Sequence, residues 1–291
     1  MTRRNLIKNS ILISAGFLGL NNKLLSNIFS DNNLSIFERI INKSEKFGWQ
    51  KLSINELIIN ISKEFIGTPY VGGTLDGNEI EKCVINFQGL DCVTFFENSL
   101  VMARIIKKRK LTFNDLIDEL TFTRYRNGEL GDYSSRLHYT SDWIFDNIKK
   151  NVVIDKTELI GGEEFHPNVF FMSKNPDKYN QLKNKPYLVK KIKSIEDNIN
   201  TKFLYYIPTN QISEQEKLIE SGDILALATN IPGLDYSHTG LAYRDENDNL
   251  RFFHASSVKK EVLIDINLSE YMNKKKKDIG ITVLKPIEPR V

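Results

Sequence analysis

The chain has 291 residues, enough for one domain with a sizeable buried core, and its 40 basic and 37 acidic side chains leave a formal net charge of only +3. This near balance gives no case for a nucleic-acid-binding protein. Two cysteines, Cys83 and Cys92, are too few for a disulfide scaffold and lack the paired spacing of a structural zinc site. We therefore expect no metal and no other cofactor.

The N-terminus has the pattern of an export signal. Arg3 and Arg4 precede an apolar run at residues 11–20, which is too short for a membrane span of about 20 residues and is typical of a signal peptide. The arginine pair also resembles a twin-arginine signal. We expect a signal peptide at residues 1–30, and an exported, periplasmic mature chain without a membrane span. An amphipathic first helix is the alternative.

The first half of the remaining chain is predicted to be helical. Ser53 and Glu56 form a capping box, and Asp91 is a suitable N-cap for the apolar helix that follows it. A glycine-rich loop at residues 70–77 lies between these two helices. Two further helices are predicted at residues 112–127 and 135–150.

The second half changes to the alternating pattern of short strands. Strands are predicted at residues 152–154, 169–172, 203–207, 224–228, 239–243, 250–254, 261–264 and 280–284. The stretch 173–200 is rich in Lys, Asn and Pro and suggests a surface insertion. Helices followed by an antiparallel sheet indicate an α+β fold, which we expect to form a single domain over residues 31–291.

Cys92, His238 and His254 are the candidate catalytic residues. A cysteine at a helix start is expected to have a lowered pKa, because the helix N-terminus favours the thiolate. A histidine can accept the thiol proton, and a second polar group can orient that histidine. The residues therefore predict a cysteine hydrolase. Zinc binding by the same three residues is an alternative, although it requires a general-base carboxylate that the sequence does not reveal.

The spacing of the two histidines fits a β-hairpin. Their midpoint lies in the polar, turn-like run at residues 245–249, so a hairpin there places His238 and His254 opposite each other or one pair apart on the same face. A slip of one residue would separate them. Gly240 would leave a space beside the base for a substrate or for the cysteine helix. Two half-buried strand histidines satisfied by their neighbours are the structural alternative.

The motifs together resemble a bacterial family described as N-acetylmuramoyl-L-alanine amidase-like, within the NlpC-type superfamily of papain-like cell-wall hydrolases. The resemblance covers about residues 50 to 285. It is carried by Gly67-Thr68-Pro69-Tyr70, by residues 90–97, 124–128, 135–139 and 142–144, by Gly222-Asp223-Ile224, by Ser237-His238-Thr239-Gly240-Leu241 and by Phe253-His254-Ala255.

The resemblance implies a papain-like fold, with a helical first half packed on an antiparallel sheet, and hydrolysis of an amide bond in peptidoglycan. Cys92 would be the nucleophile, His238 the general acid and base, and His254 the residue that orients His238. The Cys92 N–H is a candidate oxyanion donor, and Tyr70 would supply a second by analogy with the superfamily. The partner would be peptidoglycan or a muropeptide.

Substrate contacts are expected on both sides of the nucleophile. Gly72 and Gly73 leave room for a bulky lactyl-sugar. Arg124, Arg126, Arg136 and His138 form a dense cationic stretch, which either binds carboxylates of the stem peptide or pins its loop through salt bridges. We expect cleavage between N-acetylmuramic acid and L-alanine. The alternatives are a γ-D-glutamyl-diamino acid endopeptidase and a non-catalytic wall-binding module.

Overall fold

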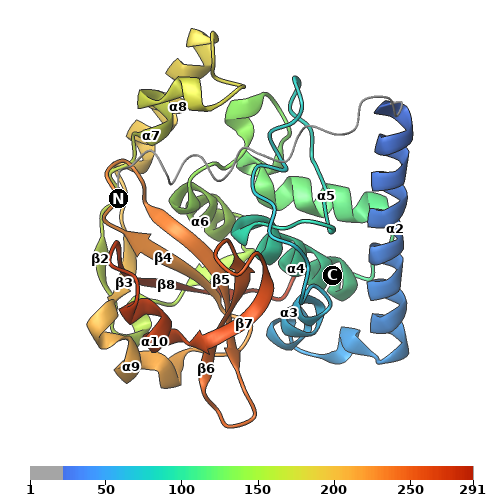
Figure 1. Ribbon diagram of the computed structural model, residues 1–291. Helices are drawn as coiled ribbons and strands as arrows, with labels where there is room; N and C mark the ends of the chain where they lie inside the picture. The colour runs from blue at the N-terminus through green and yellow to red at the C-terminus, as the bar shows by residue number, and fades with distance from the viewer. Residues whose placement is uncertain (1–21, 291) are drawn as a thin grey trace.

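The computed structural model describes residues 22–290 and shows helices packed against one twisted antiparallel sheet (Figure 1). Most of the expected signal peptide, residues 1–21, lies outside the described residues, and helix α2 begins at Asn22. No helix among the residues described is long and apolar enough to cross a membrane. The predicted α+β class is confirmed.

The main helices described are α2 (Asn22–Lys46), α3 (Ile54–Lys63), α4 (Cys92–Lys107), α5 (Phe113–Arg124) and α6 (Thr140–Lys149). Helices α3, α4 and α5 begin where the capping residues predict. The capping boxes of α3 and α5 are present, and Asp91 forms a third with Thr94 at the start of α4. Helix α6 starts later than predicted, because residues 133–135 form a separate 3-10 turn capped by Asp132.

The sheet has eight strands in the order β2-β3-β8-β4-β5-β6-β7, and β1 also pairs with β8. All of these pairings are antiparallel. The strands are β1 (Val153–Asp155), β2 (Glu163–Phe165), β3 (Leu204–Pro208), β4 (Ile224–Thr229), β5 (Tyr236–Arg244), β6 (Leu250–Ser256), β7 (Glu261–Asn267) and β8 (Asp278–Pro286).

One predicted strand, at residues 169–172, is wrong. Val169 makes only an isolated bridge with Gly233, and the chain turns into the short helix α7 (Phe171–Lys174). The apolar run is buried there for a different reason, since Val169 and Met172 pack in a cluster with Tyr133 and Tyr139. Apolar content alone therefore did not distinguish a strand from a buried turn of helix.

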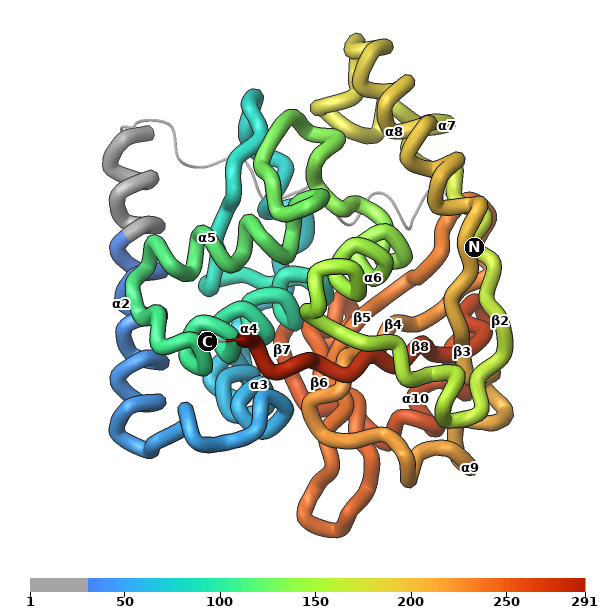
Figure 2. The backbone as a smooth tube through the Cα atoms, turned by 180° about the vertical axis from the view of Figure 1, so that it is seen from behind, coloured from blue at the N-terminus to red at the C-terminus, as the bar shows by residue number. Residues whose placement is uncertain are grey.

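The two faces of the sheet are covered by different elements. In β4, Ile224 and Ala226 belong to the large core under the helices, while Leu225 and Leu227 belong to a second core on the opposite face. Figures 1 and 2 show α3 to α6 on one side of the sheet and the shorter helices α9 (Ile212–Gln215) and α10 (Leu268–Asn273) at the other. Helix α4 contacts β5 and β6, so its first turn meets the sheet.

The predicted surface insertion folds into its own small layer. It contains α7 and α8 (Pro186–Ile199), which pack on Tyr133 and Tyr139 through a separate buried cluster. In both views α7 and α8 lie at one end of the molecule, far from α2 and α3 (Figures 1 and 2). Glu196 of α8 fixes this layer, because the Tyr139 hydroxyl donates to its Oε1 at 2.8 Å.

Candidate active site

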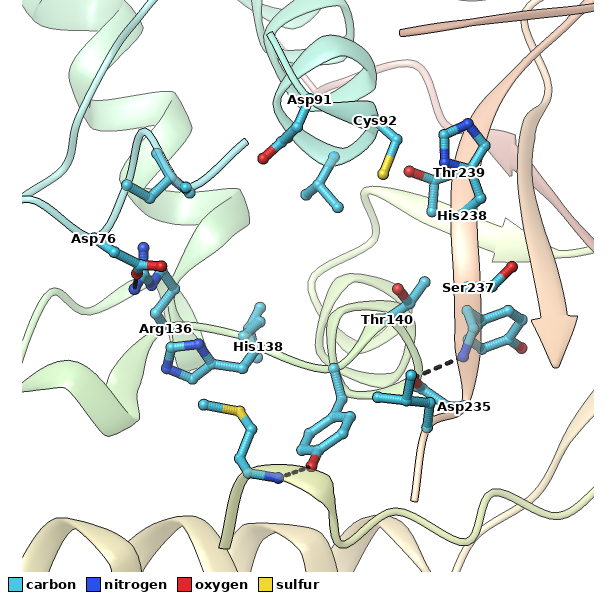
Figure 3. Close-up of a pocket in the computed structure, with 18 of the residues that line it drawn as sticks. Asp76, Asp91, Cys92, Arg136, His138, Thr140, Asp235, Ser237, His238 and Thr239 are labelled. Atoms are coloured by element: carbon cyan, nitrogen blue, oxygen red, sulfur yellow. Dashed lines mark hydrogen bonds and ion pairs between the residues drawn. The ribbon is translucent and has the colours of Figure 1, made fainter. Parts of the chain in front are cut away.

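The first turn of α4 opens into a cavity of about 320 Å³ that contains the Cys92 side chain. The cavity is lined by side chains from five segments, at residues 73–76, 91–93, 133–140, 172–179 and 234–239. Asp91 fixes the start of the helix, since its carboxylate accepts the Thr94 N–H at 2.8 Å. The N-cap places Cys92 at the first helical position, where its side chain projects from the helix end (Figure 3).

The protonation state of Cys92 differs from the expectation. The predicted lowering of its pKa by the helix N-terminus does not prevail. Burial, together with the nearby Asp91 carboxylate, raises the pKa of the thiol to about 11. The hydroxyl and N–H of Thr239 and the N–H of Val93 oppose this increase. Desolvation is the stronger effect, so Cys92 is a neutral thiol at rest.

His238 and His254 meet as the hairpin spacing predicts. Leu241 on β5 lies opposite Phe253 on β6, which places the two histidines one pair apart on the same face. His238 Nε2 lies 2.7 Å from His254 Nδ1. His238 also lines the cavity with Cys92, and Figure 3 shows the Cys92 sulfur directed toward the segment of β5 that carries His238 and Thr239.

Gly240 has a different role from the one expected. A Cβ at this position would lie 2.7 Å from a Phe252 ring carbon and 2.9 Å from the His254 Cβ, both too close for a side chain. The space beside His238 is therefore occupied by β6 and is not open to a substrate or to α4. Glycine at this position allows His254 to approach His238.

Both histidines are neutral. Burial lowers the pKa of His238 to about 3, with further lowering by His254 and Lys275. Burial also lowers the pKa of His254 to about 4, although Asp265 acts in the opposite direction. The resting site thus pairs a thiol with an imidazole and not a thiolate with an imidazolium.

Asp265 is a site residue that the sequence reasoning missed. Its Oδ2 lies 3.3 Å from His254 Nε2, and its Oδ1 lies 2.8 Å from the Lys259 ammonium. A signal was present, because a lone aspartate follows an apolar run on the strand after His254. The strand was predicted to end at residue 264, whereas β7 continues to Asn267.

The glycine-rich loop borders the cavity. Gly73 lines it, and φ of +76° explains a glycine there. Tyr70 lies near Cys92, since burial, Cys92 and Asp91 together raise the pKa of its phenol to about 12. Gly72 is exposed and lies outside the cavity lining, where a Cβ would be 3.8 Å from the Tyr70 hydroxyl.

The cationic residues predicted to bind substrate fall into two groups, those that line the cavity and those that only support the fold. Arg124 does not line the cavity, and its Nε donates to Glu97 Oε2 at 2.9 Å. Arg126 also lies outside the lining and makes a two-pronged ion pair with Asp142, at 2.8 and 2.7 Å. These contacts agree with the alternative in which the arginines pin their loop through salt bridges and do not bind the stem peptide.

Two residues of the same stretch do line the cavity. The Arg136 guanidinium is balanced by Asp76 and by Glu81. The His138 ring packs against the Tyr133 ring at a tilt of 43°, and its Nε2 lies 2.7 Å from the Tyr133 carbonyl oxygen. Burial, aided by Arg136, lowers the pKa of His138 to about 3, so it contributes a neutral ring and not a cation.

The geometry does not favour zinc ligation by the candidate triad. His238 Nε2 and His254 Nδ1 are hydrogen-bonded to each other, and His254 Nε2 faces Asp265, so both His254 nitrogens are engaged. Within residues 22–290, no group of three or more His, Cys, Asp or Glu side chains is arranged to hold a metal ion.

Comparison with known families identifies a matching family model. Residues 60–281 match the model of a family described as N-acetylmuramoyl-L-alanine amidase-like. These residues include Tyr70, Cys92, His238, His254 and Asp265. No curated protein matches the sequence.

Solved structures give further similarities. An N-acetylmuramoyl-L-alanine amidase from Bacteroides uniformis has 33% identity and a TM-score of 0.76, over 80% of this chain and 98% of that one. A Bacteroides fragilis protein described as a candidate xylanase has 34% identity and a TM-score of 0.73, over 77% and 98% of the two chains. A Legionella pneumophila protein at 23% identity shares the fold, with a TM-score of 0.67 over 90% and 96%.

Proposed function

The chain belongs to the N-acetylmuramoyl-L-alanine amidase-like family, and we propose that it cleaves the amide bond between N-acetylmuramic acid and L-alanine in peptidoglycan by a cysteine mechanism. The observation that carries this proposal is that Cys92 and His238 line one cavity, while His238 Nε2 is hydrogen-bonded at 2.7 Å to His254 Nδ1 behind it. A nucleophile beside an oriented base is the arrangement that acyl transfer requires.

The proposed reaction starts from the neutral pair. His238 accepts the Cys92 proton as the sulfur attacks the amide carbonyl, because neither charged form is stable alone in the buried site. In this proposal the Cys92 N–H and the Tyr70 hydroxyl donate hydrogen bonds to the tetrahedral oxyanion. His238 then protonates the leaving L-alanine nitrogen and the C–N bond breaks. With His238 as base, water cleaves the muramoyl thioester and restores the thiol.

We further propose that the fold is of the papain-like, NlpC type. Its support is the placement of Cys92 on the first turn of a buried helix, α4, that packs against an antiparallel sheet carrying the histidines on adjacent strands. Export of the chain is likewise proposed, from Arg3, Arg4 and the apolar run after them, since mature peptidoglycan lies outside the cytoplasm.

The cavity does not favour glycoside hydrolysis. That reaction needs two carboxyl groups facing the scissile bond, one as acid and one as base or nucleophile. Each aspartate of the lining has another partner: Asp91 caps α4, Asp76 pairs with Arg136, and Asp235 accepts both the N–H and the hydroxyl of Ser141.

The bond cleaved is tested by mass spectrometry of purified sacculi and muropeptides after digestion. We expect glycan without peptide, together with intact stem peptides that begin at L-alanine. Cys92→Ala should abolish product release. Cys83→Ala is the matched control and should remain active, since Cys83 only packs below α5 with its thiol toward the Ile117 carbonyl.

The alternatives give different results in the same experiment. Glycan that keeps L-alanyl-D-glutamate on N-acetylmuramic acid, together with released peptides that begin at the diamino acid, would identify the endopeptidase activity. Binding to sacculi without any product, at a range of pH values, would identify a wall-binding module. Activity of Cys92→Ala would refute the cysteine mechanism.

A further inference from the structure

We propose that Asp265 is a positioning residue that sets the tautomers of both site histidines, so that the His238 nitrogen facing Cys92 is free to accept a proton. The inference rests on the proposed cysteine mechanism. It concerns two consecutive hydrogen bonds through three residues, from His238 Nε2 to His254 Nδ1 at 2.7 Å, and from His254 Nε2 to Asp265 Oδ2 at 3.3 Å.

The direction of the hydrogen bonds follows from the chemistry of the last group. An ionised carboxylate only accepts hydrogen bonds, so His254 must carry its proton on Nε2. Asp265 remains ionised because, although burial acts against it, Lys259, the Ile266 N–H and His254 together lower its pKa. A neutral imidazole with its proton on Nε2 has a free lone pair on Nδ1.

The same reasoning then fixes His238. Since His254 Nδ1 accepts, His238 Nε2 must donate, and His238 Nδ1 carries no proton. Nδ1 is the nitrogen left for Cys92, as both residues line the cavity. The opposite set of tautomers would place a proton on His238 Nδ1, and that ring could not act as the base.

Among residues 22–290, the His254 ring is hydrogen-bonded to His238 and Asp265 alone. His254 is 1% exposed and lies between the Phe252 ring, at 4.4 Å, and the Tyr271 ring, at 5.3 Å. Both rings pack against the imidazole, and neither is hydrogen-bonded to it among the described residues. The charged groups around the pair, Lys259 and Lys275, are cations and cannot accept its proton.

The surroundings of Asp265 predict what an amide would do there. Oδ1 accepts from the Lys259 ammonium and from the Ile266 N–H, each at 2.8 Å. In Asp265→Asn the amide oxygen must keep that position to satisfy both donors, which directs the NH₂ group toward His254 Nε2. A donor at this place reverses the direction of both hydrogen bonds, so that His254 Nδ1 donates to His238 Nε2 and the His238 proton moves to Nδ1.

The decisive measurement is ¹⁵N NMR of histidine-labelled protein at neutral pH, which distinguishes protonated from bare ring nitrogens. The chain has only four histidines, so each ring can be assigned with single substitutions. We expect His254 protonated on Nε2 and His238 on Nε2 in the wild type, and both protons on Nδ1 in Asp265→Asn. Asp197→Asn, at an exposed ion pair on α8, is the matched control and should change neither ring.

Kinetics give the second readout. Asp265→Asn should lower kcat by about 10²- to 10³-fold with little change in KM. This loss is smaller than the ~10⁴-fold loss in kcat when the aspartate of a Ser-His-Asp triad is changed to asparagine, because Asp265 acts through one more ring. Iodoacetamide labelling of Cys92, with Cys83 as internal reference, should slow in parallel. Asp265→Glu should recover part of both rates and the wild-type tautomers.

The outcomes separate this inference from the proposed function. Wild-type protein with a proton on His238 Nδ1 would overturn the assignment, as would an Asp265→Asn variant with unchanged tautomers and near wild-type labelling. If no muropeptide is cleaved although the NMR and labelling results are as expected, the proposed substrate is wrong and the role of Asp265 stands.

Discussion

Replacing Arg124 by methionine should destabilise the protein without a direct effect on substrate binding. Its side chain is 3% exposed and that of Glu97 is 2% exposed. The Glu97 carboxylate accepts Arg124 Nε at 2.9 Å and Trp143 Nε1 at 3.0 Å, and Arg124 Nη1 donates to the Val84 carbonyl at 2.6 Å. Arg124→Met leaves Glu97 buried with one hydrogen bond and no counter-charge.

The magnitude follows from the burial of both partners. Breaking a buried ion pair by removing one partner costs about 3–5 kcal/mol, which for a chain of this size is about 6–20 °C in Tm. Urea and thermal unfolding of Arg124→Met, Glu97→Gln and the double variant would measure it. The double variant should be more stable than the sum of the single effects predicts, because no uncompensated charge remains.

A matched control and a refuting result are available. Lys191→Met breaks an ion pair with Asp132 whose side chains are 55% and 37% exposed, and should cost about 0–1 kcal/mol. If Arg124→Met unfolds like the wild type but raises KM for muropeptides several-fold, Arg124 binds substrate and the scaffold assignment is wrong.

Three further predictions concern the histidines and export. Burial lowers the pKa of His138 and His238 to about 3 and of His254 to about 4. Below about pH 6.5 the unfolded chain therefore binds protons at these histidines that the native state does not. The free energy of unfolding should fall from pH 7 to pH 4, by up to ~1.4 kcal/mol per histidine per pH unit. Urea midpoints that are flat over this range would contradict the neutral assignment. His238→Ala should lower kcat by about 10³-fold or more and His254→Asn by less, because an amide can still make one orienting hydrogen bond; equal losses would argue against separate roles. Replacing both Arg3 and Arg4 by lysine should block export, as seen by cell fractionation, because the twin-arginine machinery recognises the arginine pair itself; unchanged export would leave an ordinary secretory signal.

The parts of the fold that were predicted correctly depend on short-range interactions. Asp91 and Thr94 are three residues apart and form their capping box from local geometry. The hairpin that joins His238 to His254 was predicted because its turn lies midway between them. In both cases neighbours in the sequence determine the contact, so no knowledge of distant segments was needed.

The parts that were missed depend on segments far apart in the chain. The pKa of Cys92 is set by how deeply the packed elements bury the thiol, and no local pattern reports this burial. The partners of Arg124 come from residues 84 and 97 on other segments. The insertion at residues 173–200 is polar in composition, yet it is held by Glu196, which is wholly buried beneath Tyr139.

The chain of groups behind Cys92 shows how such a site could be found from sequence. Each link joins a residue to one that is diagonal to it on the next antiparallel strand: the register Leu241–Phe253 sets His238 beside His254, and the register His254–Leu263 sets His254 beside Asp265. Diagonal residues share a face, so two hairpin turns of the correct length align all three groups. A one-residue change in either turn would move a member to the other face. The turn lengths at residues 245–249 and 257–260 are therefore as much a part of the site as the histidines, and insertion of one residue in either turn should abolish activity even where the fold is retained.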